Sequence, residues 1–574
     1  MIWITAVFFP LLIAAVCVLP GPGLRIGCRL MALAALPALY LAITGDASTE
    51  TDLENFLLKS SLGFGPSGNT FLLITSLVWL TSGLFWALGP RKTALSRSFC
   101  VMFLLTMCGN IGLVAARDAV SFYTFFAVMT FCSFSLIVHS GTDLARRAGK
   151  IYLIMAVLGE GLLIAGIMMA VFLSPSHYFI DIVSSLAWLP ETHPVFLTLF
   201  AGFGIKAGMI FLHFWLPLAH PVAPTPASAV LSASMIKAGL LGWINFFPVG
   251  VASFGTWGLA FAALGLGGAF FGAMAGLLQK DPKIILAYSS ISQMGLMIFC
   301  LGLGIMDQSL WLMAASVIYL LVFNHALSKS ALFLGTAVAG SDISGPRKII
   351  LIILLAIPAL ALAGAPFTGG AQAKYLLKEA ANAGPFNQPF LFLIFISSIL
   401  TTLLMAHFMR QMITIKKKPQ AILSQTMLWF IMIIAIPGLP WVFHELYLES
   451  RIMWTDSSLL LSAAWPVLIG IVLYLLFGRK IEKLTGIIMR TLPDAALIID
   501  KIWYHSNSRI RQHGLMETGW GQMNFARFTE RLVQSQSARK ISRDLELRIS
   551  AWSIFGLLFM SLIIIFALLA LWGI

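Results

Sequence analysis

Three lysines lie in the middle of segments that are otherwise apolar enough to cross a membrane. Lys206 and Lys374 each stand beside a stretch rich in proline or glycine, and Lys237 lies in a further apolar segment. A charged side chain at the centre of a membrane helix costs at least ~2.5–3.5 kcal/mol, so such residues usually face a bundle interior or an aqueous path. Three of them in one chain favour a relay for ions or protons.

Histidines near these lysines could exchange protons with them. His325 and Lys329 are four residues apart and therefore lie on one helix face, where a relay explains them better than packing does. His213 and His220 lie in the proline-rich stretch that follows Lys206. Because imidazole titrates near neutrality, these two could pass protons. Alternatively, they only hydrogen-bond the backbone carbonyls that the prolines free.

The composition excludes a soluble protein. Of the 574 residues, 59% are hydrophobic and only 10% are charged. The net charge of +14 does not indicate nucleic acid, because the basic residues gather in short loops between apolar runs. The six cysteines form no CxxC pair, which argues against a metal site, an iron–sulfur cluster and a disulfide framework. Since no quinone, flavin or haem motif is visible either, we expect no cofactor and no catalytic chemistry in this chain.

Runs long enough to span a bilayer recur along the sequence and predict an all-α polytopic membrane protein. The N-terminal run lacks a charged leading region, so we expect a retained first helix rather than a cleaved signal. We expect about 16 spans, at residues 3–19, 28–44, 70–89, 99–116, 119–139, 151–173, 196–216, 227–248, 257–279, 284–304, 311–338, 349–384, 388–413, 422–443, 457–477 and 551–573. The seventh and twelfth spans should be broken at Pro217–Pro226 and Pro366–Gly370, because proline and glycine interrupt the helix.

Loop charges predict the orientation in the membrane. Loops after even-numbered spans carry acids such as Glu50 and Glu191, whereas loops after odd-numbered spans are basic and include Arg146, Lys280 and Lys283. The positive-inside rule then places both termini outside the cell and the basic loops in the cytoplasm. Residues 479–549 are basic and amphipathic, which favours a helix lying along the cytoplasmic membrane surface over a solvated linker.

Four phrases resemble the antiporter-like subunits of respiratory complex I, of Mrp-type cation/proton antiporters and of membrane-bound hydrogenases. They are "HFWLPLAHPVAP", "SAVLSASMIKAG", "LAYSSISQMG" and "HALSKSALFL". The resemblance implies inverted five-helix repeats over 99–248 and 257–413, flanked by N-terminal helices within 1–98 and further helices within 422–477. It also implies a proton pathway that begins at Lys206, continues through Lys237, His325 and Lys329, and ends at Lys374.

The chain departs from that family pattern at one position. The family has a glutamate on its fifth helix that pairs with the lysine of the first broken helix, and Ala127 stands at that position here. Glu160 is the one carboxylate in the neighbouring span 151–173. Since a buried lysine without a carboxylate nearby has its charge disfavoured, either Glu160 replaces the missing partner of Lys206 or this half of the pathway has lost its coupling.

These residues favour a proton-conducting subunit of a larger complex in the plasma membrane. Its expected partners are other membrane subunits, the lipid bilayer and protons, with no nucleic acid. A redox-driven complex of the complex I or membrane-hydrogenase type is the leading interpretation. An Mrp-type antiporter that exchanges Na⁺ or K⁺, the membrane coupler of an inorganic-carbon uptake system, and a scaffold without transport remain alternatives.

Overall fold

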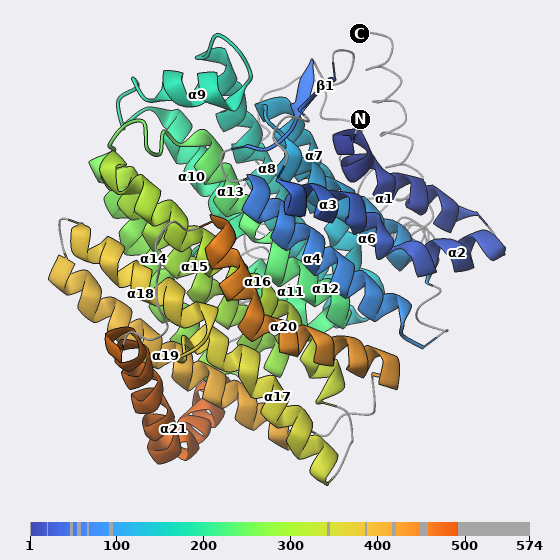
Figure 1. The fold of residues 1–574 in the computed structure, drawn as a ribbon, viewed down its shortest axis with the longest axis vertical. Coiled ribbons are helices and arrows are strands. Elements are labelled where there is room, and N and C mark those ends of the chain that lie inside the picture. The colour runs from blue at the N-terminus through green and yellow to red at the C-terminus, as the bar shows by residue number, and fades with distance from the viewer. Residues whose placement is uncertain are drawn as a thin grey trace, which may run out of the picture. The chain divides into compact units, whose positions relative to one another are not determined.

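The structure is a computed structural model that describes residues 2–19, 21–45, 50–53, 59–65, 68–90, 96–340, 345–384, 387–415, 421–447 and 457–491. Apart from one short hairpin, these residues are helical wherever they are regular (Figure 1). The α-helices are α1 Ile2–Val18, α2 Pro22–Leu30, α3 Leu36–Thr44, α4 Gly68–Ala87, α6 Arg97–Ala115, α7 Ala119–Ile137, α8 Asp143–Phe172, α9 Phe179–Leu186, α10 Pro194–Ala207, α11 Trp215–Val222, α12 Thr225–Val230, α13 Lys237–Phe246, α14 Gly255–Leu277, α15 Pro282–Met306, α16 Trp311–Val338, α17 Pro346–Ala363, α18 Gly369–Ala383, α19 Asn387–Thr414, α20 Leu423–Tyr447 and α21 Ser457–Thr491.

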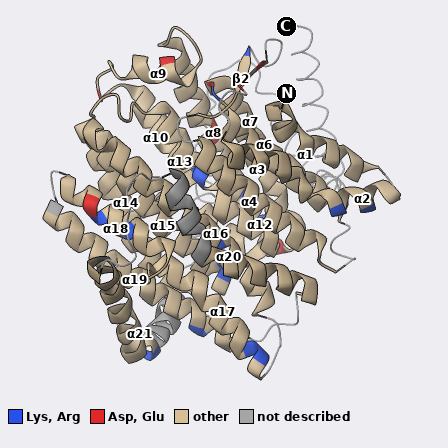
Figure 2. Ribbon diagram, in the orientation of Figure 1, with Lys and Arg blue, Asp and Glu red and all other residues tan. Residues whose placement is uncertain are grey.

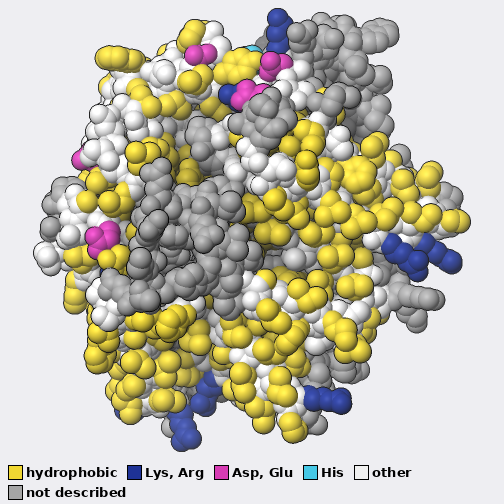
Figure 3. All heavy atoms as spheres, viewed as in Figure 1, with side chains coloured by type: hydrophobic (Ala, Val, Ile, Leu, Met, Phe, Trp, Pro, Cys, Tyr) yellow, Lys and Arg dark blue, Asp and Glu magenta, His cyan; other side chains and the backbone are white. Residues whose placement is uncertain are grey.

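Among the described residues, 11 helices are long and apolar enough to cross a membrane, or up to 12 if the bent pair around α2 and α3 is one span. Shorter apolar helices account for three more of the predicted spans, at Ile2–Val18, Pro194–Ala207 and Leu423–Ile436. The polytopic helical class is therefore confirmed, whereas the count of 16 stays a prediction. Figure 2 shows charged residues sparsely distributed along the helices, and Figure 3 shows a broad hydrophobic surface of the kind that faces lipid.

The predicted span boundaries lie within a few residues of the helices in most places. One difference is at α21, which continues to Thr491 instead of ending at Phe477. The predicted surface segment within 479–549 therefore begins as part of this helix. The rest of that segment and the last span, 551–573, lie outside the described residues.

A short hairpin was not expected from the sequence. β1 (Thr51–Leu53) pairs antiparallel with β2 (Ser60–Leu62). Its second strand is tied to the start of α7, because the Asp118 carboxylate accepts hydrogen bonds from the backbone N–H of Ser61 and of Ser121. Two three-residue strands leave too little alternation to be recognised in a sequence.

The seventh predicted span is interrupted, but the first interruption lies before the prolines. α10 ends at Ala207, and Gly208 has a left-handed backbone with φ of 66°. The Met209 N–H bonds to the Gly204 carbonyl, which closes the helix end in a Schellman motif. The prolines do not make this break, because Pro217 and Pro221 both lie within α11. The chain is also interrupted at Ala223 and Pro224, between α11 and α12, which lies within the predicted stretch Pro217–Pro226.

A second interruption has the same local backbone. α17 ends at Ala363, Gly364 has φ of 83°, and the Ala365 N–H bonds to the Leu360 carbonyl. In both places a phenylalanine with positive φ follows the glycine by three residues, at Phe211 (69°) and Phe367 (62°). This interruption begins just before the predicted stretch Pro366–Gly370.

α16 lies at the centre of the packing. It contacts α12 and the π-helical turn η4 (Leu231–Met235), and it also contacts α15, α17, α18, α20 and α4. Its residues from Leu320 to Gly335 are almost continuously buried. A helix so enclosed can hold polar side chains away from lipid, and α16 carries both His325 and Lys329.

Candidate functional site

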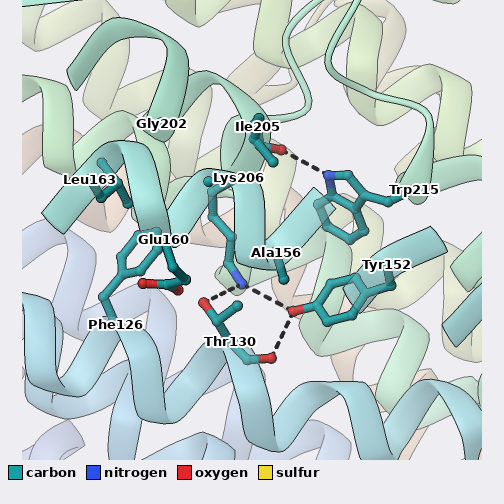
Figure 4. A pocket seen from close by; sticks show the side chains of 11 residues that line it. Phe126, Thr130, Tyr152, Ala156, Glu160, Leu163, Gly202, Ile205, Lys206 and Trp215 are labelled. Atoms are coloured by element: carbon teal, nitrogen blue, oxygen red, sulfur yellow. Dashed lines mark hydrogen bonds between the residues drawn. The ribbon is translucent and has the colours of Figure 1, made fainter. Parts of the chain in front are cut away.

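The Lys206 ammonium lies in a small cavity between α7, α8 and α10 (Figure 4). Its Nζ donates to Thr130 Oγ1 at 3.1 Å and to the Tyr152 hydroxyl at 3.4 Å. Tyr152 in turn lies 2.6 Å from Ser133 Oγ. Lys206 also stands in the last turn of α10, where the negative end of the helix dipole favours a cation.

Glu160 lines the same cavity as Lys206, from α8 (Figure 4). Its side chain is 6% exposed, and within the described ranges neither carboxylate oxygen meets the geometry of a hydrogen bond. Among the described residues, Glu160 and Lys206 are not within ion-pair distance of each other. The structure therefore places the two groups together, and their pairing stays a prediction.

Two partners of Lys206 were missed in the sequence. Thr130 lies one helical turn after Ala127 on α7 and so supplies a hydroxyl from the face where the family has its glutamate. Tyr152 lies two turns before Glu160 on α8. The signal was present in both cases, since residues that are three, four or eight apart share a helix face. These two residues could not be recognised as partners of Lys206 without knowing which helix faces meet.

Lys237 and His325 are in direct contact. Lys237 Nζ lies 2.9 Å from His325 Nδ1, although the residues are 88 positions apart in the sequence. Lys237 Nζ also donates to the carbonyl of Ala233, which belongs to the π-helical turn η4. π-turns within α-helices leave backbone groups available and occur often at functional sites. The predicted step between these two residues is thus geometrically in place.

Lys329 lies one turn beyond His325 on α16 and is fully buried. Its Nζ donates to the Leu286 carbonyl of α15 at 2.6 Å. Ser290 Oγ donates to the same carbonyl at 3.0 Å and lies 2.6 Å from Ser232 Oγ of η4. The Leu286 carbonyl and two serine hydroxyls therefore connect Lys329 to η4, the turn that also binds the Lys237 ammonium.

Lys374 lines a second small cavity together with Lys378. Lys374 Nζ donates, at 2.7 Å, to the carbonyl of Ala363, the last residue of α17. Lys378 Nζ donates to the Ser462 carbonyl of α21 at 3.2 Å. This cavity has no carboxylate in its lining, whereas the Lys206 cavity contains Glu160.

The two proline-region histidines do not bind the freed carbonyls. Neither ring nitrogen of His220 has a hydrogen-bond partner in the described part of the chain, and its ring stacks on Phe333. His213 Nδ1 also lacks a partner. Ser228 Oγ instead donates to the His220 carbonyl, at 3.0 Å, and Lys283 Nζ donates to the Ala223 carbonyl at 2.8 Å. Lys283, in the first turn of α15, therefore reaches across to the connection between α11 and α12.

The four buried lysines share one feature, which is that their acceptors are uncharged. Lys237, Lys329 and Lys374 each donate to a backbone carbonyl, and Lys206 donates to hydroxyls. Within the described ranges, no group of three or more His, Cys, Asp or Glu side chains could hold a metal ion. The arrangement can hold and release protons on amines and imidazoles that are shielded from lipid.

Comparison with known proteins identifies the family. Residues 116–403, half of the chain, match the family described as "NADH:quinone oxidoreductase/Mrp antiporter, TM". The antiporter subunit mnhA2 of Staphylococcus saprophyticus is 32% identical over 302 residues, which are 48% of this chain and 37% of that protein. Hydrogenase-4 component B of Escherichia coli is 33% identical over 255 residues, which are 43% of this chain and 37% of that protein. The chain thus spans less than half the length of these relatives.

Two solved structures share the fold. The Mrp complex from Dietzia sp. DQ12-45-1b superposes with a TM-score of 0.71 at 20% identity, over 97% of this chain and 62% of that chain. The archaeal membrane-bound sulfane sulfur reductase gives 0.71 at 19% identity, over 96% of this chain and 99% of that chain. Both are multisubunit membrane complexes. With the match over half of its length, this chain belongs to the NADH:quinone oxidoreductase/Mrp antiporter family of membrane subunits.

Proposed function

We propose that the chain conducts protons, as one subunit of an energy-converting complex of the NADH:quinone oxidoreductase or membrane-hydrogenase type. The observation that carries this proposal is the set of four buried lysines with uncharged acceptors, at helix ends, a π-turn and the central helix α16. An ammonium held by a carboxylate is locked in its charged form, whereas one held by carbonyls and hydroxyls can also lose its proton. Such groups suit a relay.

The pathway would run from the Glu160–Lys206 cavity through Lys237, His325 and Lys329 to the Lys374 cavity. The contact of 2.9 Å between Lys237 and His325 supports the central step. His213 and His220, with ring nitrogens that have no hydrogen-bond partner, would join the route beside α11. Water in the cavities would bridge the wider steps.

The matching helix interruptions support the proposed repeats over 99–248 and 257–413. Gly208 and Gly364 end α10 and α17 in the same Schellman geometry, and Phe211 and Phe367 follow at the same spacing. We therefore treat α10–α11 and α17–α18 as the broken spans in equivalent positions of two inverted repeats. Broken helices at membrane depth are a common place for ion-binding groups in transporters.

The partners and the setting are part of the same proposal. The chain would assemble with other membrane subunits in the plasma membrane, with both termini outside. Protons are the proposed cargo. The driving reaction would take place in a partner subunit.

The function is tested with Lys206→Gln and Lys374→Gln in the source organism. Proton uptake into everted membrane vesicles is measured with a pH-sensitive dye while NADH or hydrogen drives respiration. We expect each substitution to lower uptake on the order of a hundredfold, the scale of a lost proton-transfer group. Lys280→Gln, at an exposed lysine, is the matched control. Unchanged uptake in both variants, at normal complex levels on native gels, would reject the proposal.

A cation/proton antiporter is the second candidate, because several similar relatives are named antiporter subunits. The same vesicles distinguish the two without any redox substrate. A pulse of Na⁺ or K⁺ that releases protons from preloaded vesicles indicates exchange. Proton movement that needs the redox substrate and ignores both cations supports the first proposal.

A further inference from the structure

Three of the six cysteines meet at one point, although the sequence separates them widely. Cys17 is near the end of α1, Cys28 is in α2, and Cys100 is in the first turn of α6. The Sγ atoms of Cys28 and Cys100 are 2.8 Å apart, and Cys17 is within hydrogen-bonding reach of Cys28. All six cysteines are buried, and none of them is in a disulfide. A disulfide needs about 2.0 Å between its sulfurs, so the Cys28–Cys100 pair is less than 1 Å from that separation.

We propose that Cys28 and Cys100 are a site of reversible oxidation, at which a disulfide joins α2 to α6. The reagent class is a small thiol oxidant, such as a low-molecular-weight disulfide. The Cys28 thiolate attacks one sulfur of the reagent, forms a mixed disulfide and releases one thiol. The Cys100 thiolate then attacks Cys28 Sγ and releases the second thiol. Two protein thiols have thereby given two electrons and two protons to the reagent.

The local packing allows a reagent to reach the pair. α2 is nine residues long, is bent by 52° from the helix that follows, and exposes one of its faces. Arg25, Ile26, Arg29 and Leu30 are exposed around Cys28, which therefore lies one helix layer below the surface. Short, edge-lying helices open locally at a lower free energy than the core does. Oxidation would follow such an opening.

The position of Gly27 explains why the third thiol is so close. A Cβ atom at Gly27 would lie 2.5 Å from Cys17 Sγ, so only glycine lets α1 and α2 approach this closely. Cys17 can therefore compete with Cys100 to form a disulfide with Cys28. The basic loops that flank α2 and α6 place the cluster on the expected cytoplasmic side, where thiols are normally reduced and disulfides are transient.

The test uses native membranes that contain the whole chain. Membranes are treated with diamide, an azodicarboxamide that takes up both hydrogens of two thiols. The remaining thiols are then blocked with N-ethylmaleimide in denaturant, and the digest is analysed by mass spectrometry. We expect a linked pair of peptides with Cys28 and Cys100, absent before oxidation and lost again with dithiothreitol. Cys300, buried in α15, should stay alkylated as the internal control.

Two variants make the assignment specific. Cys17→Ser should keep the Cys28–Cys100 link, and Cys28→Ser should abolish it. Full alkylation of Cys28 and Cys100 after oxidation would overturn the proposal, as would a Cys17–Cys28 link in the wild-type protein. The readout is chemical, so it holds whether or not the chain conducts protons.

Discussion

At the scale of single residues, the buried lysines of this chain donate hydrogen bonds to uncharged acceptors. Lys329 and Lys374 lie on backbone carbonyls, and Lys206 lies on two hydroxyls. A buried ammonium bound in this way keeps its hydrogen bonds satisfied without a fixed counter-charge. Glu160 is the exception, because within the described part of the chain neither of its carboxylate oxygens meets the geometry of a hydrogen bond, although it lines the Lys206 cavity.

We predict that coupling in the first half depends on Glu160. We expect Glu160→Gln to reduce proton-coupled activity of the assembled complex on the order of a hundredfold, because the neutral amide can neither take up a proton nor balance the Lys206 ammonium. Proton uptake in everted vesicles measures the effect. Glu191→Gln is the matched control, since the Glu191 carboxylate accepts from the backbone N–H groups of Thr256 and Trp257 at the start of α14. Normal proton uptake in Glu160→Gln, together with a distance between Glu160 and Lys206 too wide for one bridging water, would reject the pairing of these two residues.

The sequence was informative about which residues are buried and charged, but not about what they touch. Lys206, Lys237, Lys329 and Lys374 stood out because a charge in an apolar run is costly. Their partners did not, because serine, threonine and tyrosine are common in membrane helices and only the packing selects a few of them. Lys283 is the clearest case. It was assigned to an ordinary basic loop, yet its Nζ binds the Ala223 carbonyl between α11 and α12.

At the scale of elements, the helix interruptions are made by glycines and followed by prolines. Gly208 and Gly364 supply the left-handed backbone that ends each helix, which proline cannot adopt. The prolines after Gly208 sit within or at the start of short helices, where their fixed φ is compatible with the fold. Sequence reasoning weighted proline over glycine and therefore did not anticipate the interruption at Gly208.

Gly364 offers a direct test of the second interruption. A Cβ there would meet Lys374 Cδ at 2.8 Å, in addition to the strain of φ at 83°. We expect Gly364→Ala to lower the melting temperature of the purified complex and to impair proton uptake by displacing Lys374. Gly141→Ala is the control, because Gly141 has the same left-handed backbone (φ of 65°) but has open space around its Cβ position. Its backbone strain alone costs ~1–2 kcal/mol and should leave uptake unchanged. Equal effects of the two substitutions would show that the contact with Lys374 is unimportant.

At the scale of the whole molecule, the loop charges predict which ends of the helices face the cytoplasm. The loop at Ser140 should be inside and the loop at Ser309 outside, and both serines are exposed. Since all six native cysteines are buried, single new cysteines can be labelled against a low background.

We therefore expect Ser140→Cys to react with a membrane-impermeant maleimide only in everted vesicles, and Ser309→Cys only in intact cells. The positive-inside bias of the loops is the physical reason. Labelling of whole cells and vesicles, followed by mass spectrometry, gives the answer. The reverse pattern would invert the topology, and with it the expected side of residues 479–549.

The placement of Lys206 also bears on how the chain enters the membrane during synthesis. α10 has 14 residues, so it is ~21 Å long and cannot cross a hydrocarbon core of ~30 Å by itself. Its lysine makes unaided insertion still less favourable. Thr130 and Tyr152, which receive the ammonium, belong to α7 and α8 and leave the ribosome first. The order of translation thus puts the acceptors in the bilayer before the lysine that needs them arrives.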